Sequence, residues 1–158
     1  MPDNSLLLLV DDDDDSILLL ESALERAEVA NPRVVAHSGK EAIDYLSGSG
    51  AYADRKKFPL PGLMLLDLKM PGVDGFGVLD WCRGFTKGKD LQIVVMTASN
   101  NESDRERAMS LGAAAYYVKP VSFSNLVEIV REVQERWLKA AEVPGGKKSS
   151  QKNVRAKR

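Results

Sequence analysis

The sequence predicts an α/β fold: a doubly wound parallel sheet of five strands with helices on both faces. Two observations lead to this prediction. Short, continuously apolar runs recur along the chain, which is typical of strands buried on both faces of a parallel sheet. A segment with apolar residues at helical spacing follows each run. Because strands and helices alternate, the strands are expected to pair in parallel through right-handed crossovers.

The predicted strands are short, and most of them stop at a polar residue. The first run, residues 6–10, leads directly into five aspartates at positions 11–15. Later runs stop at an aspartate, a threonine or a lysine, which is where a buried strand would reach the edge of its sheet. The five predicted strands are residues 6–10, 33–36, 63–66, 91–96 and 115–118.

Capping residues mark the ends of the predicted helices. Ser38 and Glu41 have the spacing of a capping box, and so do Ser103 and Glu106. Gly112 is expected to end the fourth helix. The predicted helices are residues 16–29 with Asp15 as N-cap, 38–46, 75–85, 103–111, and a last helix capped by Ser122, with residues 48–61 as a long loop.

Reactive side chains follow four of the five predicted strands. In open parallel sheets, binding sites lie outside the carboxyl ends of the strands. We therefore expect residues that are far apart in sequence to meet at one edge of the sheet. The residues at these positions are Asp11, Asp12, Asp67, Thr97 and Lys119.

Three carboxylates at one sheet edge repel one another and require a cation. Oxygen ligands of this kind suit Mg²⁺. With such an ion bound, Asp67 would be able to attack a phosphoryl group and form an acyl phosphate. Lys119 would neutralise charge on the transferring group, and Thr97 would donate its hydroxyl to a phosphoryl oxygen.

The run of aspartates has a second interpretation. Asp13 and Asp14 are interpreted as solvated acids near a helix N-terminus, where the helix dipole favours negative charge. An EF-hand is excluded because its spaced acidic pattern and closing glutamate are missing. Within this run of aspartates, only Asp11 and Asp12, directly after a buried strand, are predicted to bind metal.

Four segments together resemble the receiver domains of response regulators in two-component signalling. The resemblance covers about residues 5–140, nearly all of the predicted folded part. It implies a flavodoxin-like sheet with the strand order 2-1-3-4-5. The segments that carry the resemblance are residues 8–12, 65–75, 95–98 and 117–120.

The resemblance implies a role for each residue of the acidic cluster. Asp67 would be the phosphoacceptor. Asp12 would bind Mg²⁺ directly, and Asp11 would act partly through water. The main-chain carbonyl of Lys69 would complete the protein ligands.

The resemblance also implies a switch. Thr97 would be the switch hydroxyl, and Lys119 would contact the phosphoryl group. Tyr116 matches the aromatic position that turns inward on activation in this family. The Lys119–Pro120 bond is expected to be cis, as is usual in the family; only bonds before proline adopt cis cheaply.

Two further features resemble single-domain regulators that partner bacterial phytochromes or hybrid kinases. They are the insertion 48–61 and the ending Glu-Arg-Trp-Leu at 135–138. The implied partners are a sensor histidine kinase or a phosphotransfer protein, and a downstream protein target. Members of this subgroup often pair through the last helix, so Trp137 is expected either to contribute to a homodimer or to cover its own core.

Charge divides the chain into an acidic body and a basic tail. The last 15 residues hold six basic side chains and no acid, which leaves residues 1–143 with a net charge of −7. We expect residues 1–143 to form the receiver domain and 144–158 to be a disordered tail. A solvated tail is favoured over one that contacts nucleic acid or a membrane surface.

The remaining composition is that of a cytoplasmic globular protein. The longest apolar run is too short to cross a bilayer or to act as a secretory signal. The single cysteine, Cys82, is interpreted as a small core residue, because it lies in an apolar helical pattern.

Two alternative functions are disfavoured by the residues present. A dehalogenase-type phosphatase would need an aspartate where this chain has Lys69. A degenerate receiver that only binds partners would have lost one of the reactive residues, and none is lost here.

The output is expected to be a protein contact. The predicted protein is not an enzyme beyond its own phosphorylation and dephosphorylation. Because no output domain follows, the surface near Tyr116, formed by the fourth helix, fifth strand and fifth helix, is expected to change its contacts on phosphorylation.

Overall fold

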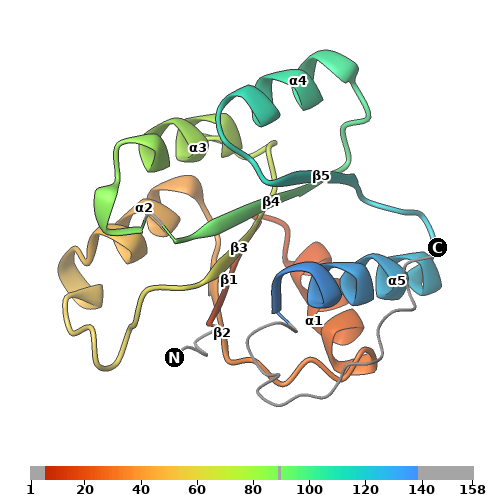
Figure 1. The fold of residues 1–158 in the computed structure, drawn as a ribbon, viewed down its shortest axis with the longest axis horizontal. Helices are drawn as coiled ribbons and strands as arrows, with labels where there is room; N and C mark the ends of the chain where they lie inside the picture. The colour runs from red at the N-terminus through yellow and green to blue at the C-terminus, as the bar shows by residue number, and fades with distance from the viewer. Residues whose placement is uncertain (1–5, 89, 139–158) are drawn as a thin grey trace.

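Strands and helices alternate along residues 6–88 and 90–138, which are the residues that this computed structural model describes (Figure 1). The strands are β1 (Leu7–Val10), β2 (Arg33–Ala36), β3 (Leu63–Leu66), β4 (Gln92–Thr97) and β5 (Ala115–Val118). The main helices are α1 (Asp14–Arg26), α2 (Gly39–Ser47), α3 (Gly75–Arg83), α4 (Glu102–Ser110) and α5 (Phe123–Val133). Three single turns, η1 (Gly50–Tyr52), η2 (Thr86–Gly88) and η3 (Gln134–Leu138), complete the elements.

The five strands form one sheet in the order β2-β1-β3-β4-β5, and every neighbouring pair is parallel. This confirms the predicted fold class and strand order. The register aligns Val10 with Leu66, and Leu66 with Val95. The residues that follow β1 and β3 therefore emerge at the same level of the sheet.

The sheet separates two hydrophobic cores. Alternate residues of a strand point to opposite faces. Leu8 and Met64 pack in the core beneath α2, α3 and α4, whereas Leu7 and Leu65 pack in the core beneath α1 and α5. Figure 1 shows the same division of the helices between the two faces. Because both faces are covered, the reactive groups are accessible only at the sheet edge.

Two helices begin earlier than predicted. Asp13, not Asp15, caps α1, because its carboxylate accepts a hydrogen bond from the Asp15 main-chain N–H at 3.2 Å. Asn101, not Ser103, caps α4, and its side-chain oxygen accepts from the Ser103 main-chain N–H at 2.8 Å. Ser38 and Ser122 cap α2 and α5 as expected.

The insertion between α2 and β3 has a defined structure. Its ring-bearing residues Tyr52 and Phe58 pack edge to face, with their centroids 5.3 Å apart. The Tyr45 hydroxyl donates to the Pro59 carbonyl at 2.8 Å, and Arg55 donates to the Leu46 carbonyl at 2.6 Å. These bonds fold residues 48–61 against α2, and a short helical turn, η1, replaces part of the expected loop.

The last described turn, η3, returns to the core. Trp137 is half-buried and packs against the core beneath α1 and α5. The expected boundary at residue 143 and the expected tail 144–158 lie outside the described residues. In the part of the chain that the structure describes, no helix combines the length and apolarity needed to span a membrane.

Candidate functional site

Asp67 lies directly after β3 and is almost fully buried. Its main-chain N–H donates to the Val10 carbonyl at 3.0 Å, which extends the pairing of β1 with β3 by one residue. Its Oδ1 atom accepts a hydrogen bond from the Leu68 N–H at 2.7 Å. The side chain is therefore held by the backbone, with 7% of the residue exposed.

Asp11 occupies the equivalent position after β1. Its main-chain N–H donates to the Ala36 carbonyl at 3.1 Å, and its Oδ1 accepts from the Asp13 N–H at 3.0 Å. Asp12, the next residue, is exposed. One carboxylate oxygen from each of Asp11, Asp12 and Asp67 lies within 4.8 Å of the others. The three predicted carboxylates therefore meet.

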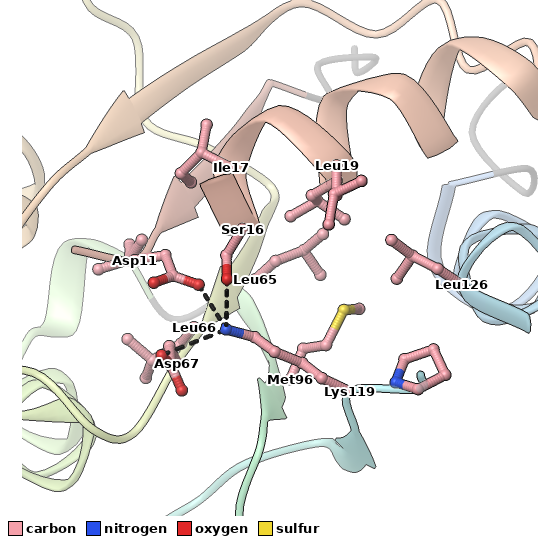
Figure 2. A pocket seen from close by; sticks show the side chains of 13 residues that line it. Asp11, Ser16, Ile17, Leu19, Leu65, Leu66, Asp67, Met96, Lys119 and Leu126 are labelled. Atoms are coloured by element: carbon pink, nitrogen blue, oxygen red, sulfur yellow. Dashed lines mark hydrogen bonds and ion pairs between the residues drawn. The ribbon is translucent and has the colours of Figure 1, made fainter. Parts of the chain in front are cut away.

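Lys119 crosses the edge of the sheet to reach these acids. Its main-chain N–H donates to the Thr97 carbonyl at 2.7 Å. Its ammonium lies 2.7 Å from Asp11 Oδ2 and 3.4 Å from Asp67 Oδ2 (Figure 2). The structure thus brings together a cation and two buried carboxylates that are far apart in sequence.

Burial and neighbouring charges shift the pKa values of Asp11 and Lys119 in opposite directions. Burial raises the pKa of Asp11, and the hydrogen bond from Lys119 opposes that shift. Burial lowers the pKa of Lys119, but the Asp11 hydrogen bond and the nearby charge of Asp67 outweigh it, so the pKa of Lys119 is raised. Lys119 is therefore positively charged at neutral pH.

The donor set fits a divalent cation. Carboxylate oxygens are the ligands that Mg²⁺ prefers, and the ion requires few protein ligands because it retains several waters. The acidic cluster offers three such oxygens, one of them on an exposed side chain that faces water. Lys119 contacts two of the same residues, so its ammonium and the metal would share this negative charge.

Thr97 is fully buried at the end of β4. Its Oγ1 atom accepts from the Ser99 N–H at 3.4 Å. Asp67 follows Leu66, which pairs with Val95, so Thr97 lies one residue further along its strand than Asp67. The side chain of Lys119 contacts those of Asp11 and Asp67. Thr97 is connected to them by its main-chain carbonyl, which accepts from the Lys119 N–H.

Tyr116 points inward. Its residue is 9% exposed, and its hydroxyl donates to the Ser99 carbonyl at 2.8 Å. The Arg105 guanidinium lies over the ring, 5.9 Å from its centroid. The hydroxyl of the predicted switch tyrosine is therefore bonded to the β4–α4 loop that follows Thr97.

Asp104 connects two loops of the site and was not identified from the sequence. Its carboxylate accepts from the Ser99 hydroxyl at 2.6 Å and pairs with the Lys69 ammonium at 3.2 Å. The hydrogen bond from Ser99 and then the one from Lys69 hold the pKa of Asp104 below its usual value. Only its place in the first turn of α4 could have drawn attention to it.

The prediction of a cis bond before Pro120 was wrong. The described peptide bonds are all trans, and Lys119–Pro120 is among them. Trans is the ordinary form even before proline, where it is favoured by about 0.5–1 kcal/mol. The Lys119 side chain still reaches both buried acids from this backbone.

Ser16 was also missed. The Lys119 ammonium donates to its hydroxyl oxygen at 3.3 Å (Figure 2). Ser16 and Lys119 line a cavity of about 180 Å³ whose apolar walls come largely from α1 and β3, with single residues from β1, β4 and α5. The sequence placed Ser16 at the start of the first predicted helix, but nothing in it linked Ser16 to Lys119.

Comparison with known proteins gives the same family from two directions. Residues 7–131 match the response regulator receiver domain. The phosphorylated cyanobacterial phytochrome response regulator RcpA is 33% identical, with a TM-score of 0.79 over 89% of this chain and 99% of that one. RPA3017, a response regulator in red light signaling of R. palustris, is 30% identical with a TM-score of 0.81 over the same shares.

A third solved relative carries a metal. The Mn²⁺-bound form of the response regulator Rcp1 is 28% identical, with a TM-score of 0.77 over 89% of this chain and 99% of that one. Rcp1 comes from Synechocystis sp.. These relatives confirm the resemblance to phytochrome response regulators.

Some curated relatives are longer than the matched stretch. The probable methanogenesis regulatory protein FilR2 of Methanothrix harundinacea is 37% identical over 68% of this chain and 66% of its own length. The probable transcriptional regulator ycf27 of Porphyridium aerugineum is 38% identical, and the chain spans 41% of its length.

Proposed function

Because the chain belongs to the response regulator receiver domain family, we propose that it accepts a phosphoryl group on Asp67. The donor is a sensor histidine kinase or a phosphotransfer protein. The observation that carries the proposal is the contact of Lys119 with both buried acids, Asp11 at 2.7 Å and Asp67 at 3.4 Å. Such a cluster has more negative than positive charge and a fixed carboxylate, which suits a metal-assisted nucleophile.

The cofactor that fits is Mg²⁺. Asp11, Asp12 and Asp67 supply its carboxylate ligands, and the Lys69 carbonyl is the fourth group expected to hold it. Binding of Mn²⁺ by Rcp1 is in keeping with a divalent site in this fold. When bound, the ion supplies charge neutralisation to the phosphoryl oxygens.

Residues of the protein carry out the other parts of phosphoryl transfer. An Asp67 oxygen forms the O–P bond while the P–N bond to the donor histidine breaks, and the electron pair stays on the nitrogen, which takes up a proton. The Leu68 N–H keeps the carboxylate oriented at 2.7 Å during attack. Lys119, protonated at neutral pH, neutralises charge on the transferred group. The buried Thr97 hydroxyl would donate to a phosphoryl oxygen after transfer. Hydrolysis of the acyl phosphate returns Asp67.

The output is a change in protein contacts. Tyr116 and Thr97 are linked through Ser99, which accepts from the tyrosine hydroxyl at 2.8 Å and donates its N–H to Thr97 Oγ1 at 3.4 Å. A shift of Thr97 towards a phosphoryl group would therefore reach the α4–β5–α5 surface. The kinase partner is of the phytochrome-associated or hybrid type, and a homodimer through α5 and Trp137 is a further prediction. The cytoplasmic location expected from the sequence stays a prediction.

Intact mass spectrometry tests whether Asp67 is phosphorylated. Wild-type protein is incubated with acetyl phosphate, with and without Mg²⁺, beside Asp67→Asn and the control Asp80→Asn, which changes an exposed acid on α3. We expect one added phosphoryl group in wild type and Asp80→Asn, dependent on Mg²⁺ and absent in Asp67→Asn. If wild type gains none from acetyl phosphate or from a purified kinase, the chain is a phosphorylation-independent binding module instead.

A further inference from the structure

The Lys119 ammonium is surrounded by three oxygen acceptors. A lysine ammonium has three N–H donors and accepts nothing. Its acceptors here are Asp11 Oδ2 at 2.7 Å, Ser16 Oγ at 3.3 Å and Asp67 Oδ2 at 3.4 Å. Figure 2 shows the three contacts converging on the nitrogen from β1, α1 and β3. Ser16 is the only one of these three acceptors that carries no charge.

The orientation of the Ser16 hydroxyl is fixed by a second bond. Ser16 Oγ donates to Asp13 Oδ2 at 3.0 Å. A hydroxyl has a single proton, so its lone pairs are left to accept from Lys119. Asp13 is held in turn as the N-cap of α1, because its other oxygen accepts from the Asp15 N–H at 3.2 Å. The result is a chain of bonds from the start of α1 to the Lys119 ammonium.

We propose that Ser16 is a positioning residue for Lys119, oriented by Asp13, that holds the ammonium within reach of Asp67. This inference rests on the proposed phosphoryl transfer at Asp67. The shorter contact to Asp11 would by itself draw the ammonium towards β1 and away from the reacting oxygen. A neutral acceptor on α1 restrains the nitrogen in a third direction without adding negative charge to the cluster.

Ser16 is expected to keep its contact with Lys119 while the phosphoryl group is transferred. When phosphorus bonds to Asp67, the ammonium is expected to exchange that carboxylate for a phosphoryl oxygen. Ser16 and Asp11 do not take part in the exchange, so they would keep Lys119 at the site while its third contact changes. Loss of Ser16 should therefore lower the rate of phosphorylation without preventing it.

Three variants test the role. Ser16→Ala removes the acceptor and suits a helix, Ser16→Thr keeps a hydroxyl, and Ser47→Ala is a control on the exposed side of α2. We expect Ser16→Ala to lower the phosphorylation rate at saturating donor and Mg²⁺ by about two- to tenfold, the size of one hydrogen bond. Ser16→Thr should restore most of the rate, and Ser47→Ala should equal wild type.

A second readout does not depend on phosphorylation. The Lys119 ammonium nitrogen is followed by NMR in the unphosphorylated protein. We expect its proton exchange to be faster in Ser16→Ala and near wild type in Ser16→Thr. Unchanged exchange in Ser16→Ala would overturn the positioning role, and so would equal loss of rate in Ser16→Ala and Ser16→Thr. If wild type is not phosphorylated but the proton exchange of the Lys119 ammonium still changes as expected in the Ser16 variants, the proposed phosphorylation fails. The positioning of Lys119 by Ser16 is then still supported.

Discussion

The Tyr116 hydroxyl donates a hydrogen bond to the Ser99 carbonyl at 2.8 Å, which ties β5 to the loop that follows β4. The same serine donates its hydroxyl to Asp104 on α4 at 2.6 Å. Ser99 is two residues beyond the buried Thr97. One loop residue therefore connects the end of β4 with both Tyr116 and the first turn of α4.

Tyr116→Phe should loosen this connection. The substitution removes the hydroxyl and leaves the Ser99 carbonyl without that partner, so the free energy of unfolding should fall by about 1 kcal/mol. Urea denaturation measures the change. Tyr117→Phe is the control, because the Tyr117 hydroxyl binds Glu132 at an exposed position. An equal or larger loss in the control would contradict the importance of the Ser99 bond.

Asp104→Asn should make stability less dependent on acid pH. The hydrogen bonds from Ser99 and Lys69 hold the pKa of Asp104 below its usual value of 3.8. A carboxyl with a lowered folded pKa stabilises the fold above its unfolded pKa, and that contribution is lost as pH falls through the folded pKa. Wild type should therefore unfold less readily than the variant at pH 7, and the difference should shrink below about pH 4. A difference that persists unchanged at pH 3 would contradict this.

Gly75→Ala should disturb the loop after Asp67. A Cβ at position 75 would meet the Asp67 carbonyl oxygen and would lie 2.7 Å from Leu68 Cα, both main-chain atoms that cannot easily move. We expect a loss of about 1–3 kcal/mol in unfolding free energy and weaker Mg²⁺ binding. Gly84→Ala is the matched control, since its nearest atom would be 3.9 Å away. Thermal melts and calorimetric Mg²⁺ titration distinguish the two variants.

Lys119→Met should strengthen Mg²⁺ binding while slowing phosphorylation. The ammonium contacts Asp11 and Asp67, so its removal leaves their charge available to the metal. We expect the dissociation constant for Mg²⁺ to fall by at least about fivefold, because a unit charge about 4 Å away is worth about 1 kcal/mol in water and more at a protein surface. Titration calorimetry checks this, with Lys40→Met on α2 as control. Weaker binding in Lys119→Met would show that Lys119 supports the site in another way.

Cys82 should react slowly with thiol reagents. Burial raises the pKa of its thiol to about 12, and only the thiolate is nucleophilic. At pH 8, native protein should react with a disulfide reagent far more slowly than urea-unfolded protein, by about tenfold or more. Similar rates in the two states would mean that the side chain is more accessible than its position on α3, packed against the core, indicates.

Local signals predicted the strands and their ends well. Three of the five strand ranges, those at residues 33–36, 63–66 and 115–118, match the structure. Of these, only β3 is buried and apolar throughout, whereas β2 and β5 lie at the edges of the sheet and are partly exposed. Helix starts were less certain. Asp13 and Asp15 are both acceptable caps in sequence, and only the bond from the Asp15 N–H to Asp13 distinguishes them.

The sequence by itself determined the α/β order, the parallel sheet and the placement of Asp11, Asp67, Thr97 and Lys119 at one edge. Each of these follows from periodicity and from where an apolar run stops, which are properties of neighbouring residues. Tertiary structure alone decided that Tyr116 bonds Ser99, that Asp104 joins Lys69 to Ser99, and that the Lys119–Pro120 bond is trans. It also decided that Lys119 contacts Ser16, 103 residues away. Such contacts depend on how helices pack against the sheet, and that packing is set by the whole core and not by any local pattern.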